Sequence, residues 1–468
     1  MNMTIAASNR HCPLPHYHHE KRPWGGFERF TVNESSTVKI LYLLPGKRLS
    51  LQRHAKRSEW WRVIDGDGEV TLGSHSYAVS VGDEIEIPVG TLHRLSGGPR
   101  GLAVLEIGFG EFDENDIFRV EDDFGRSRPP VHPCGALALH RAKGNPVLNP
   151  GYAQWEAMAV MNPAAIREGG RTHLFYRAIG TDGVSRLGYA ASDDGVTLDE
   201  RLPFPVFAHE NPMPARAGRF DPVAYASGGS WTGVEDPRAV MIDGRVYLTY
   251  NAFNGWDSMR VGLTSISVAD LQAKRWNFSP PKYLSPPGQR HKNWALFPER
   301  IKGKFALFHN LHAANDGRVC VAYVDDPLGE GAPVADFASP DPQLLPDSPC
   351  AWHRRMRSIG PPPIRTSLGW LVLYHAMDVY EPRYYKLGAM LLDGEDPCRV
   401  IARSPVPVLE PEVPYEISEG IKPGIVYSCG TVIRDDQLTV YYGAADTVVC
   451  AASTPLAAFV HAIAAGQA

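Results

Sequence analysis

The segment Tyr247-Leu248-Thr249-Tyr250-Asn251 is an apolar strand that ends in an aromatic residue followed by a polar one. Similar segments occur at four other places, and they end at Arg177, His309, His375 and Gly443. The five end residues are separated by 74, 58, 66 and 68 positions along the chain. Such spacing is typical of a repeat architecture, in which each unit buries its apolar surface against its neighbours.

Each repeat continues with another strand, such as Leu187-Gly188-Tyr189-Ala190-Ala191, and then with an acidic turn. Units of this kind cannot bury both faces alone, so a ring closed around a central channel is the simplest solution. The sequence therefore predicts a five-bladed β-propeller. Because equivalent strand positions would meet at one mouth of the channel, we expect one pocket to contain Arg177, Asn251, His309 and His375.

The stretch Gly233-Val234-Glu235-Asp236-Pro237-Arg238 lies shortly before the second repeat strand, where the inner strand of that blade would run along the channel. Because a proline disfavours the helical region for the preceding residue, we expect extended backbone, with one acid facing a cavity and its neighbour facing away. An isolated Glu-Asp-Pro is more often a surface turn. The imidazole, amide and guanidinium groups expected nearby favour a site that recognises a polyol.

Residues 21–126 carry short alternating segments separated by Gly and Pro, as in a small β-barrel. Gln52 and His54 are two positions apart and so lie on one strand face, and Glu59 follows after a short interval. A second segment ends at His93. These four side chains form a mixed nitrogen and oxygen set that suits a divalent metal such as zinc, cobalt, nickel or manganese.

The composition, with 44 Gly, 40 Pro and 44% hydrophobic residues in 468, is that of a turn-rich β protein with two or three domains. The net charge of −5 and the lack of a basic tract give nucleic acid and anionic membranes no electrostatic handle. Seven scattered cysteines without paired spacing predict reduced thiols. Since Met1–Pro15 is no signal peptide and no apolar run approaches the ~20 residues that span a bilayer, we expect a cytoplasmic protein.

The sequence predicts an all-β chain in four parts. Residues 1–20 form a flexible tail, and its histidine patch (His11, His16, His18 and His19) could hold a metal but is better explained as a frayed end. Residues 21–126 form the small barrel, and residues 127–145 form a proline-rich, semi-rigid linker. The propeller takes up residues 146–460.

The barrel segments resemble the cupin domain of the type II mannose-6-phosphate isomerases over about one hundred residues, through Arg22-Pro23-Trp24-Gly25, Pro45-Gly46, Ser50-Leu51-Gln52 and Asp116-Ile117-Phe118-Arg119. The resemblance implies a double-stranded β-helix barrel with an open-sided metal site that assists an aldose–ketose interconversion. Glu59 and His93 would be ligands, and Arg57 or Lys56 would be available for a phosphate. A barrel that keeps the ligands but only binds sugar, or that dimerises, is the alternative.

The rest of the chain resembles glycoside hydrolase family 130 over more than three hundred residues, through Met161-Asn162-Pro163-Ala164-Ala165, Tyr176-Arg177, Ser185-Arg186-Leu187-Gly188, Gly233-Val234-Glu235-Asp236-Pro237-Arg238, Leu296-Phe297-Pro298-Glu299, Tyr374-His375 and Tyr441-Tyr442-Gly443-Ala444-Ala445-Asp446-Thr447. The resemblance implies a five-bladed propeller that cleaves β-mannosides with inversion. Asp236 would donate a proton to the glycosidic oxygen, directly or through a mannosyl hydroxyl. The mannose would be held by Asn162, Arg177 and Asp446, with Arg186 and Arg238 nearby.

The resemblance leaves open whether inorganic phosphate or water attacks the sugar. Lys292 and His375 match positions that look like phosphate contacts, whereas His309-Asn310 stands where the phosphorylases usually have His-Arg. Hydrolysis would need a second carboxylate as base, and the candidates are Glu299, Asp378 and Glu412. Phosphorolysis to α-mannose 1-phosphate is slightly favoured, with hydrolysis by a β-mannosidase as the alternative.

A non-catalytic reading is a propeller that binds mannosides beside a cupin that serves for dimerisation, because propellers often act as binding platforms. Retention of Asp236 with the expected mannose contacts counts against this reading, since binding alone requires no proton donor. The expected partners are mannose-containing oligosaccharides, and a homo-oligomer is compatible with the sequence.

Overall fold

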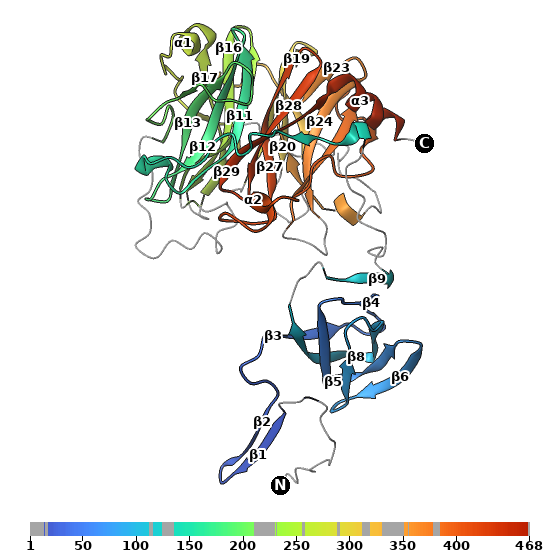
Figure 1. The fold of residues 1–468 in the computed structure, drawn as a ribbon. Helices are drawn as coiled ribbons and strands as arrows, with labels where there is room; N and C mark the ends of the chain where they lie inside the picture. Colours follow the sequence, from blue (N-terminus) through green and yellow to red (C-terminus); the bar gives the residue numbers. More distant parts are fainter. Residues whose placement is uncertain are drawn as a thin grey trace. The chain divides into compact units, whose positions relative to one another are not determined.

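The computed structural model describes residues 14, 17–111, 116–123, 135–209, 230, 232–254, 258–287, 291–310, 319–329, 351–353, 355–377 and 384–466. The chain divides into two compact units, Met1–Pro130 and Val131–Ala468. Both consist mainly of strands (Figure 1), with 57% strand and 7% helix, so the predicted all-β class is confirmed. None of the helices in these ranges has the length and apolar character that a membrane span requires.

The first unit contains a seven-stranded sheet in which β5 (Arg57–Leu72) and β8 (His93–Gly110) pair antiparallel along almost their whole length. The other strands are β3 (Ser36–Leu43), β4 (Leu51–Arg53), β6 (His75–Ser80), β7 (Glu84–Ile87) and β9 (Phe118–Glu121). β3, β4 and β9 lie on the β8 side of this pair, and β6 and β7 pair with β5. This is the predicted cupin-like unit.

Two consecutive tryptophans on β5 show how the sheet separates its faces. Trp61 packs in the main apolar cluster with Val63, whereas Trp60 packs on the other face with Leu14 and Ile107. Successive side chains of a strand point to opposite faces, so β5 supplies two cores.

A separate hairpin precedes the barrel and consists of β1 (His18–Arg22) and β2 (Gly25–Arg29). His18 and His19 of the histidine patch lie in β1, so residues 18–20, which the sequence assigned to the tail, are part of this strand. His11 and His16 lie outside the described residues, as do positions 127–134 of the expected linker. Positions 135–145 include η1 (Gly135–Leu137) and β10 (His140–Arg141).

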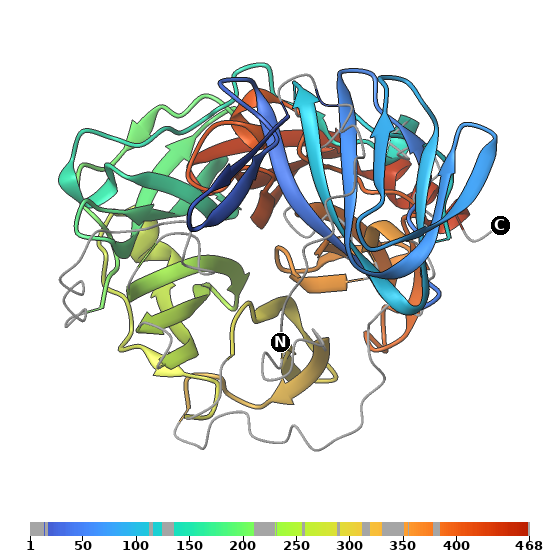
Figure 2. The ribbon, with the colours of Figure 1, turned by 90° about the horizontal axis from the view of Figure 1, so that it is seen from below.

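The second unit is the predicted five-bladed propeller, and Figure 2 shows its blades arranged in a ring. The first two blades are β11 (Ala159–Glu168), β12 (Arg171–Ile179), β13 (Val184–Ser192) and β14 (Glu200–Arg201), then β15 (Thr232–Ile242), β16 (Arg245–Asn254), β17 (Ser258–Ser267) and β18 (Lys282–Tyr283). The third is β19 (Ala295–Ile301), β20 (Lys304–Asn310) and β21 (Val319–Val324). The fourth is β22 (Arg355–Ile359), β23 (Ile364–Thr366), β24 (Gly369–Met377), β25 (Lys386–Leu392) and β26 (Val400–Arg403).

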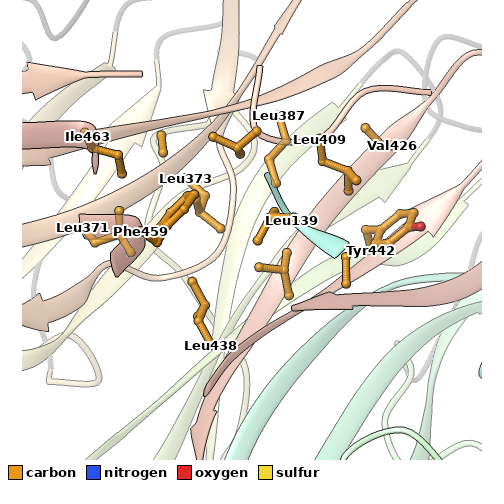
Figure 3. Close-up of a cluster of buried hydrophobic side chains, with 14 of the residues drawn as sticks. Leu139, Leu371, Leu373, Leu387, Leu409, Val426, Leu438, Tyr442, Phe459 and Ile463 are labelled. Carbon is orange, nitrogen blue, oxygen red and sulfur yellow. The ribbon is translucent and has the colours of Figure 1, made fainter. Parts of the chain in front are cut away.

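The fifth blade closes the ring with strands from both ends of the unit. β27 (Val426–Arg434), β28 (Gln437–Ala444) and β29 (Val448–Pro455) are completed by β10, which pairs with β29. Arg141 of β10 donates to Glu416, which is fully buried, at 2.9 and 2.8 Å. Between the fourth and fifth blades, Figure 3 shows Leu139 among the core side chains, with Phe459 and Ile463 of α3 (Leu456–Ala465).

The remaining helices are short. They are α1 (Val268–Gln272), α2 (Pro414–Ile417), η2 (Gln154–Glu156) and η3 (Ala351–His353).

A recurring tyrosine and glycine pair explains part of the repeat pattern. Tyr176, Tyr250 and Tyr374 lie directly opposite Gly188, Gly262 and Gly388 on the next strand. A Cβ atom at any of these glycines would lie 2.2 to 2.5 Å from the tyrosine ring. The tyrosine therefore covers the backbone of its neighbour, and only glycine leaves room for it.

The first strand of every blade, β11, β15, β19, β22 and β27, has a break in its pairing register. A bulge bends its strand and redirects the side chains next to it. In the first two blades the irregular part begins immediately after Met161 and Glu235, so Asn162 and Asp236 lie at equivalent positions.

Candidate active site

All five blades contribute side chains to one pocket in the second unit. Its volume, including open space at the mouth, is roughly 560 Å³, which is in the range of small-molecule sites. The lining residues are polar or charged with few exceptions: Asn162, Arg177, Glu235, Asp236, Lys292, Asn293, Arg357, Ser358, Tyr385, Lys422, Ile425, Tyr427 and Asp446. A pocket of this composition suits a ligand with many hydroxyl groups or with negative charge.

The backbone at the pocket has an unusual conformation. Asn162, Asp236, Asn293 and Asp446 have φ values of 47°, 48°, 64° and 50°. Asn and Asp tolerate this left-handed region better than other non-glycine residues, and such strained positions concentrate at functional sites. The expectation of extended backbone at Asp236 is therefore wrong. Because the bulge turns Asp236 back, both Glu235 and Asp236 line the pocket instead of facing opposite sides.

Asp236 accepts hydrogen bonds on both carboxylate oxygens. Asn162 Nδ2 and Arg177 Nη1 donate to Oδ1 at 2.8 and 3.1 Å, and Asn251 Nδ2 donates to Oδ2 at 3.3 Å. Burial alone would raise the pKa of Asp236, but the Arg177 cation and the Asn162 amide outweigh it and lower the pKa. In the free protein Asp236 is therefore held as a carboxylate, and it needs additional negative charge nearby to take up a proton.

Glu235 is also buried and has a different balance of partners. Arg177 Nη2 donates to Glu235 Oε1 at 2.9 Å, and Ser230 Oγ donates to the same oxygen. Burial raises the pKa of Glu235 to about 7, with Asp236 adding to the rise and Arg177 opposing it. The two neighbouring acids thus differ in proton affinity and share one arginine.

Lys292, Arg357 and Lys422 add three cationic side chains to the pocket. The Arg357 guanidinium and the Lys422 ammonium lie 5.9 and 6.0 Å from the centre of the Tyr385 ring. Burial lowers the pKa of Lys292, although Tyr385 and Asp236 oppose the effect. The pocket therefore offers a cationic set well suited to an anionic ligand such as phosphate. Arg357 and Lys422 were missed by reasoning from the sequence.

Among the other predicted site residues, His375 does not line the pocket. It is fully buried, and its ring stacks on that of Tyr427 with the ring centres 3.9 Å apart. Its Nε2 accepts from the Ser428 backbone N–H at 2.9 Å, and its Nδ1 lies 3.1 Å from Ser358 Oγ. Both ring nitrogens are engaged, so the direct phosphate contact expected for His375 is corrected to a supporting position behind Ser358 and Tyr427.

Two predicted arginines also lie away from the cavity. Arg238 is 2% exposed and donates to the carbonyl oxygens of Gly360, Ile359 and Asp236, so it braces the inner strands. Arg186 is paired with Asp182 at 2.6 Å.

The predicted meeting of four strand ends is only partly correct. Arg177 lines the pocket, Asn251 lies just behind Asp236, and neither His309 nor His375 is part of the lining. Three of the side chains that reach the cavity, Asn162, Asp236 and Arg357, lie at breaks in the register of their strands, where a bulge redirects the side chain.

The candidate bases for hydrolysis that can be located do not face the pocket. Glu299 is exposed and lies 3.8 Å from Arg365, and Glu412 is exposed and paired with Arg141 at 2.9 Å. Asp378 lies outside the described residues, as does the side chain of Asn310.

A regular offset could have located part of the pocket. Asn162 precedes Arg177 by 15 positions, and Asp236 precedes Asn251 by 15. Counting back 16 positions from His309 gives Asn293, which also lines the pocket. Asp446 and Lys422 lie in loops outside this frame, so the offset could not have found them.

In the first unit, His54, Glu59 and His93 come together in the barrel, with their ligand atoms within 4.8 Å of one another. His54 Nε2 lies 3.2 Å from Glu59 Oε1, and His93 Nε2 lies 3.5 Å from Glu59 Oε2. Arg57 Nε also donates to Glu59 Oε1, at 2.9 Å. Gln52, the fourth predicted ligand, pairs with His93 across the strands, and its Oε1 accepts from Ser50 Oγ at 2.6 Å.

Comparison with known proteins finds a matching family model for each unit. Residues 140–464 match the family model described as β-1,4-mannooligosaccharide phosphorylase, and residues 10–122 match the model described as the C-terminal part of mannose-6-phosphate isomerase. The chain is 38% identical to a 1,2-β-oligomannan phosphorylase of Thermoanaerobacter over 324 residues, which are 67% of this chain and 96% of that protein.

Two further relatives extend this picture. The solved β-1,2-mannobiose phosphorylase of Listeria innocua, in complex with β-1,2-mannobiose, aligns with a TM-score of 0.54 and 21% identity, over 69% of this chain and 99% of that structure. The alginate biosynthesis protein AlgA of Pseudomonas aeruginosa is 35% identical over 112 residues, which are 24% of this chain and 23% of AlgA. The isomerase-like cupin is therefore joined to a propeller of the mannoside phosphorylase type.

Proposed function

The chain belongs to glycoside hydrolase family 130 through residues 140–464, and on that premise we propose that its propeller cleaves β-mannosides by phosphorolysis. The relatives with 36 to 38% identity are phosphorylases of β-1,2-linked mannosides, so this linkage is the proposed substrate. The observation that carries the proposal is one buried acid, Asp236, in a pocket that also holds Arg177, Lys292, Arg357 and Lys422.

In the proposed reaction a phosphate oxygen attacks C1 of the mannosyl group as the bond from C1 to the glycosidic oxygen breaks. The departing oxygen keeps the electron pair of that bond and takes the proton of Asp236, directly or through a mannosyl hydroxyl. Attack from the opposite face inverts the configuration, so the products are α-mannose 1-phosphate and a sugar shortened by one mannose.

The mannosyl group would be held by Asn162, Arg177 and Asp446, which come from the first and fifth blades. Asn162 and Arg177 also donate hydrogen bonds to Asp236, so the residues that would bind the sugar also hold the Asp236 carboxylate in position. Such shared contacts place the acid in a defined geometry before the substrate arrives.

The phosphate would lie against Lys292, Arg357 and Lys422. These groups supply charge-assisted hydrogen bonds to a phosphate dianion. The dianion would in turn raise the pKa of Asp236, because a nearby negative charge disfavours a carboxylate. Phosphate binding would thus favour protonation of Asp236, which is ionised in the free protein.

Hydrolysis is the second candidate reaction for the propeller, and one observation favours it. Glu235 and Asp446 also line the pocket, so other carboxylates lie near Asp236.

The proposal is tested by incubating the protein with β-1,2- and β-1,4-mannobiose, with and without inorganic phosphate, and identifying the sugar released. Phosphorolysis predicts mannose 1-phosphate only when phosphate is present, and free mannose at an equal rate without phosphate would establish hydrolysis.

For the cupin we propose a divalent metal site formed by His54, Glu59 and His93, with Gln52 adjacent. The donor set fits zinc or another transition metal. Within the described residues, the buried atoms Glu59 Oε2 and His93 Nε2 make no hydrogen bond and lie 3.5 Å from each other, as expected for atoms that hold an ion between them. A metal bound there would act as a Lewis acid on a sugar carbonyl. The neighbouring Arg57 or Lys56 would orient a sugar phosphate.

A further inference from the structure

Arg177 connects the two acids of the pocket. Its Nη2 donates to Glu235 Oε1 at 2.9 Å and its Nη1 donates to Asp236 Oδ1 at 3.1 Å. The guanidinium is 1% exposed, so water does not screen these contacts. A change in the charge of Glu235 must therefore be felt at Asp236.

We propose that Glu235 is a positioning residue that acts through Arg177 to help Asp236 hold its proton for catalysis once phosphate is bound. This inference rests on the proposed function, because it assigns Asp236 the role of proton donor. Glu235 is not required to contact the substrate in this account. Its carboxylate competes with Asp236 for Arg177, which donates to both acids.

The groups that face Glu235 define the balance of charge. Arg177 comes from β12, Asp236 from the same strand β15, and Lys292 from the segment before β19. Ser230 Oγ adds an uncharged donor. The wider pocket adds one further carboxylate and two further cations from the other blades: Asp446, Arg357 and Lys422. Arg238 of β15 lies behind the pocket, and its charge also acts on Asp236.

The direction of the effect follows from these charges. Burial raises the pKa of Glu235 to about 7, so Glu235 becomes ionised as the pH rises through neutrality. Ionised Glu235 repels the charge on Asp236 and attracts Arg177, and both effects raise the pKa of Asp236. The donor therefore keeps its proton at higher pH than it would beside a neutral neighbour.

Glu235→Gln removes this charge with little change in shape. The amide carbonyl can still accept from Arg177 Nη2 and Ser230 Oγ, so the guanidinium stays in place. Without the negative charge, the pKa of Asp236 falls further below its usual value. Since Asp236 must be protonated to donate, the loss of activity on the alkaline side moves to lower pH.

The test is the pH profile of kcat/KM for β-1,2-mannobiose with saturating phosphate, for wild type and for Glu235→Gln. We expect the profiles to coincide at acidic pH and the alkaline limb of the variant to lie roughly one pH unit lower. At a pH above both limbs this corresponds to a loss of about tenfold. Glu412→Gln, at an exposed acid away from the pocket, should retain the position of the wild-type limb.

Superimposable profiles for wild type and Glu235→Gln would overturn the inference. So would an equal loss at every pH, because that pattern belongs to a structural residue or to a direct proton donor. A wild type that releases free mannose without phosphate would contradict phosphorolysis. The shift of the alkaline limb by Glu235→Gln could still be measured, because Asp236 would be the proton donor in that reaction too. The two failures are therefore distinguishable.

Discussion

Asn162 Nδ2 donates a hydrogen bond to Asp236 Oδ1 over 2.8 Å, and it thereby joins the bulges of the first and second blades. The two residues have φ values of 47° and 48° and are each followed by proline. The same bulge, with a left-handed residue before a proline, thus directs an amide side chain in one blade and a carboxylate in the next. The strained conformation is held by the strands on either side, which is how such strain persists at functional sites.

Replacing Asp236 with Asn should remove the proton donor while leaving the pocket intact. We expect kcat for β-1,2-mannobiose phosphorolysis to fall by about 10²- to 10⁴-fold, the usual contribution of general acid catalysis. Glu412→Gln, at an exposed acid away from the pocket, serves as the control and should keep wild-type kcat. Near-normal turnover by Asp236→Asn would exclude Asp236 as the donor.

Arg357→Gln should weaken phosphate binding more than sugar binding. Loss of a charged hydrogen bond predicts a rise in the KM for phosphate of roughly 10- to 100-fold, with a smaller change in the KM for mannobiose. The matched control is Arg275→Gln, because the Arg275 side chain is 59% exposed and is paired with Asp270. If the phosphate KM of Arg357→Gln equals that of wild type, Arg357 does not belong to the phosphate site.

Gly443→Ala should disturb the site through Asn162. A Cβ atom at Gly443 would lie 2.1 Å from Asn162 Oδ1, so the amide must move and its bond to Asp236 must weaken. We expect kcat/KM to fall by about tenfold or more, in line with the cost of displaced catalytic groups. Gly144→Ala, whose added Cβ would lie 3.9 Å from Val196 Cγ1, should be silent. Unchanged kinetics of Gly443→Ala in a folded protein would show that Asn162 need not hold this position.

Glu59→Gln should abolish metal binding in the cupin without affecting the propeller. Equilibration with zinc or cobalt followed by elemental analysis should find about one ion per wild-type chain and less than a tenth of that in the variant, since the lost carboxylate lies between both histidines. Glu69→Gln, an exposed acid on the same strand, is the control. Retention of the ion by Glu59→Gln would refute the proposed ligand set.

The fold followed from the sequence because its signals are local and repeated. The five strand ends from Arg177 to Gly443 predicted the number of blades. Glycine occurs at positions 188 and 262 because a tyrosine of the neighbouring strand packs over each of them. Such contacts between neighbouring strands recur in the sequence at a regular spacing, so they can be read without a structure.

The site was less accessible to sequence reasoning. Asp236 was placed on extended backbone, since the proline rule describes single residues and does not reveal a bulge. Strand periodicity assigns a face but not a depth, so His375 was expected in the pocket although it lies behind Ser358 and Tyr427. Arg357 and Lys422 carry no motif of their own, and only the closed ring brings them to the cavity.

The most direct test of the central claim is to follow β-1,2-mannobiose by phosphorus and proton NMR in the presence and absence of inorganic phosphate. Phosphorolysis with inversion predicts α-mannose 1-phosphate and free mannose in equal amounts when phosphate is present, and negligible cleavage without it. Cleavage to mannose alone at the same rate in both samples, or a β-configured phosphate product, would contradict it.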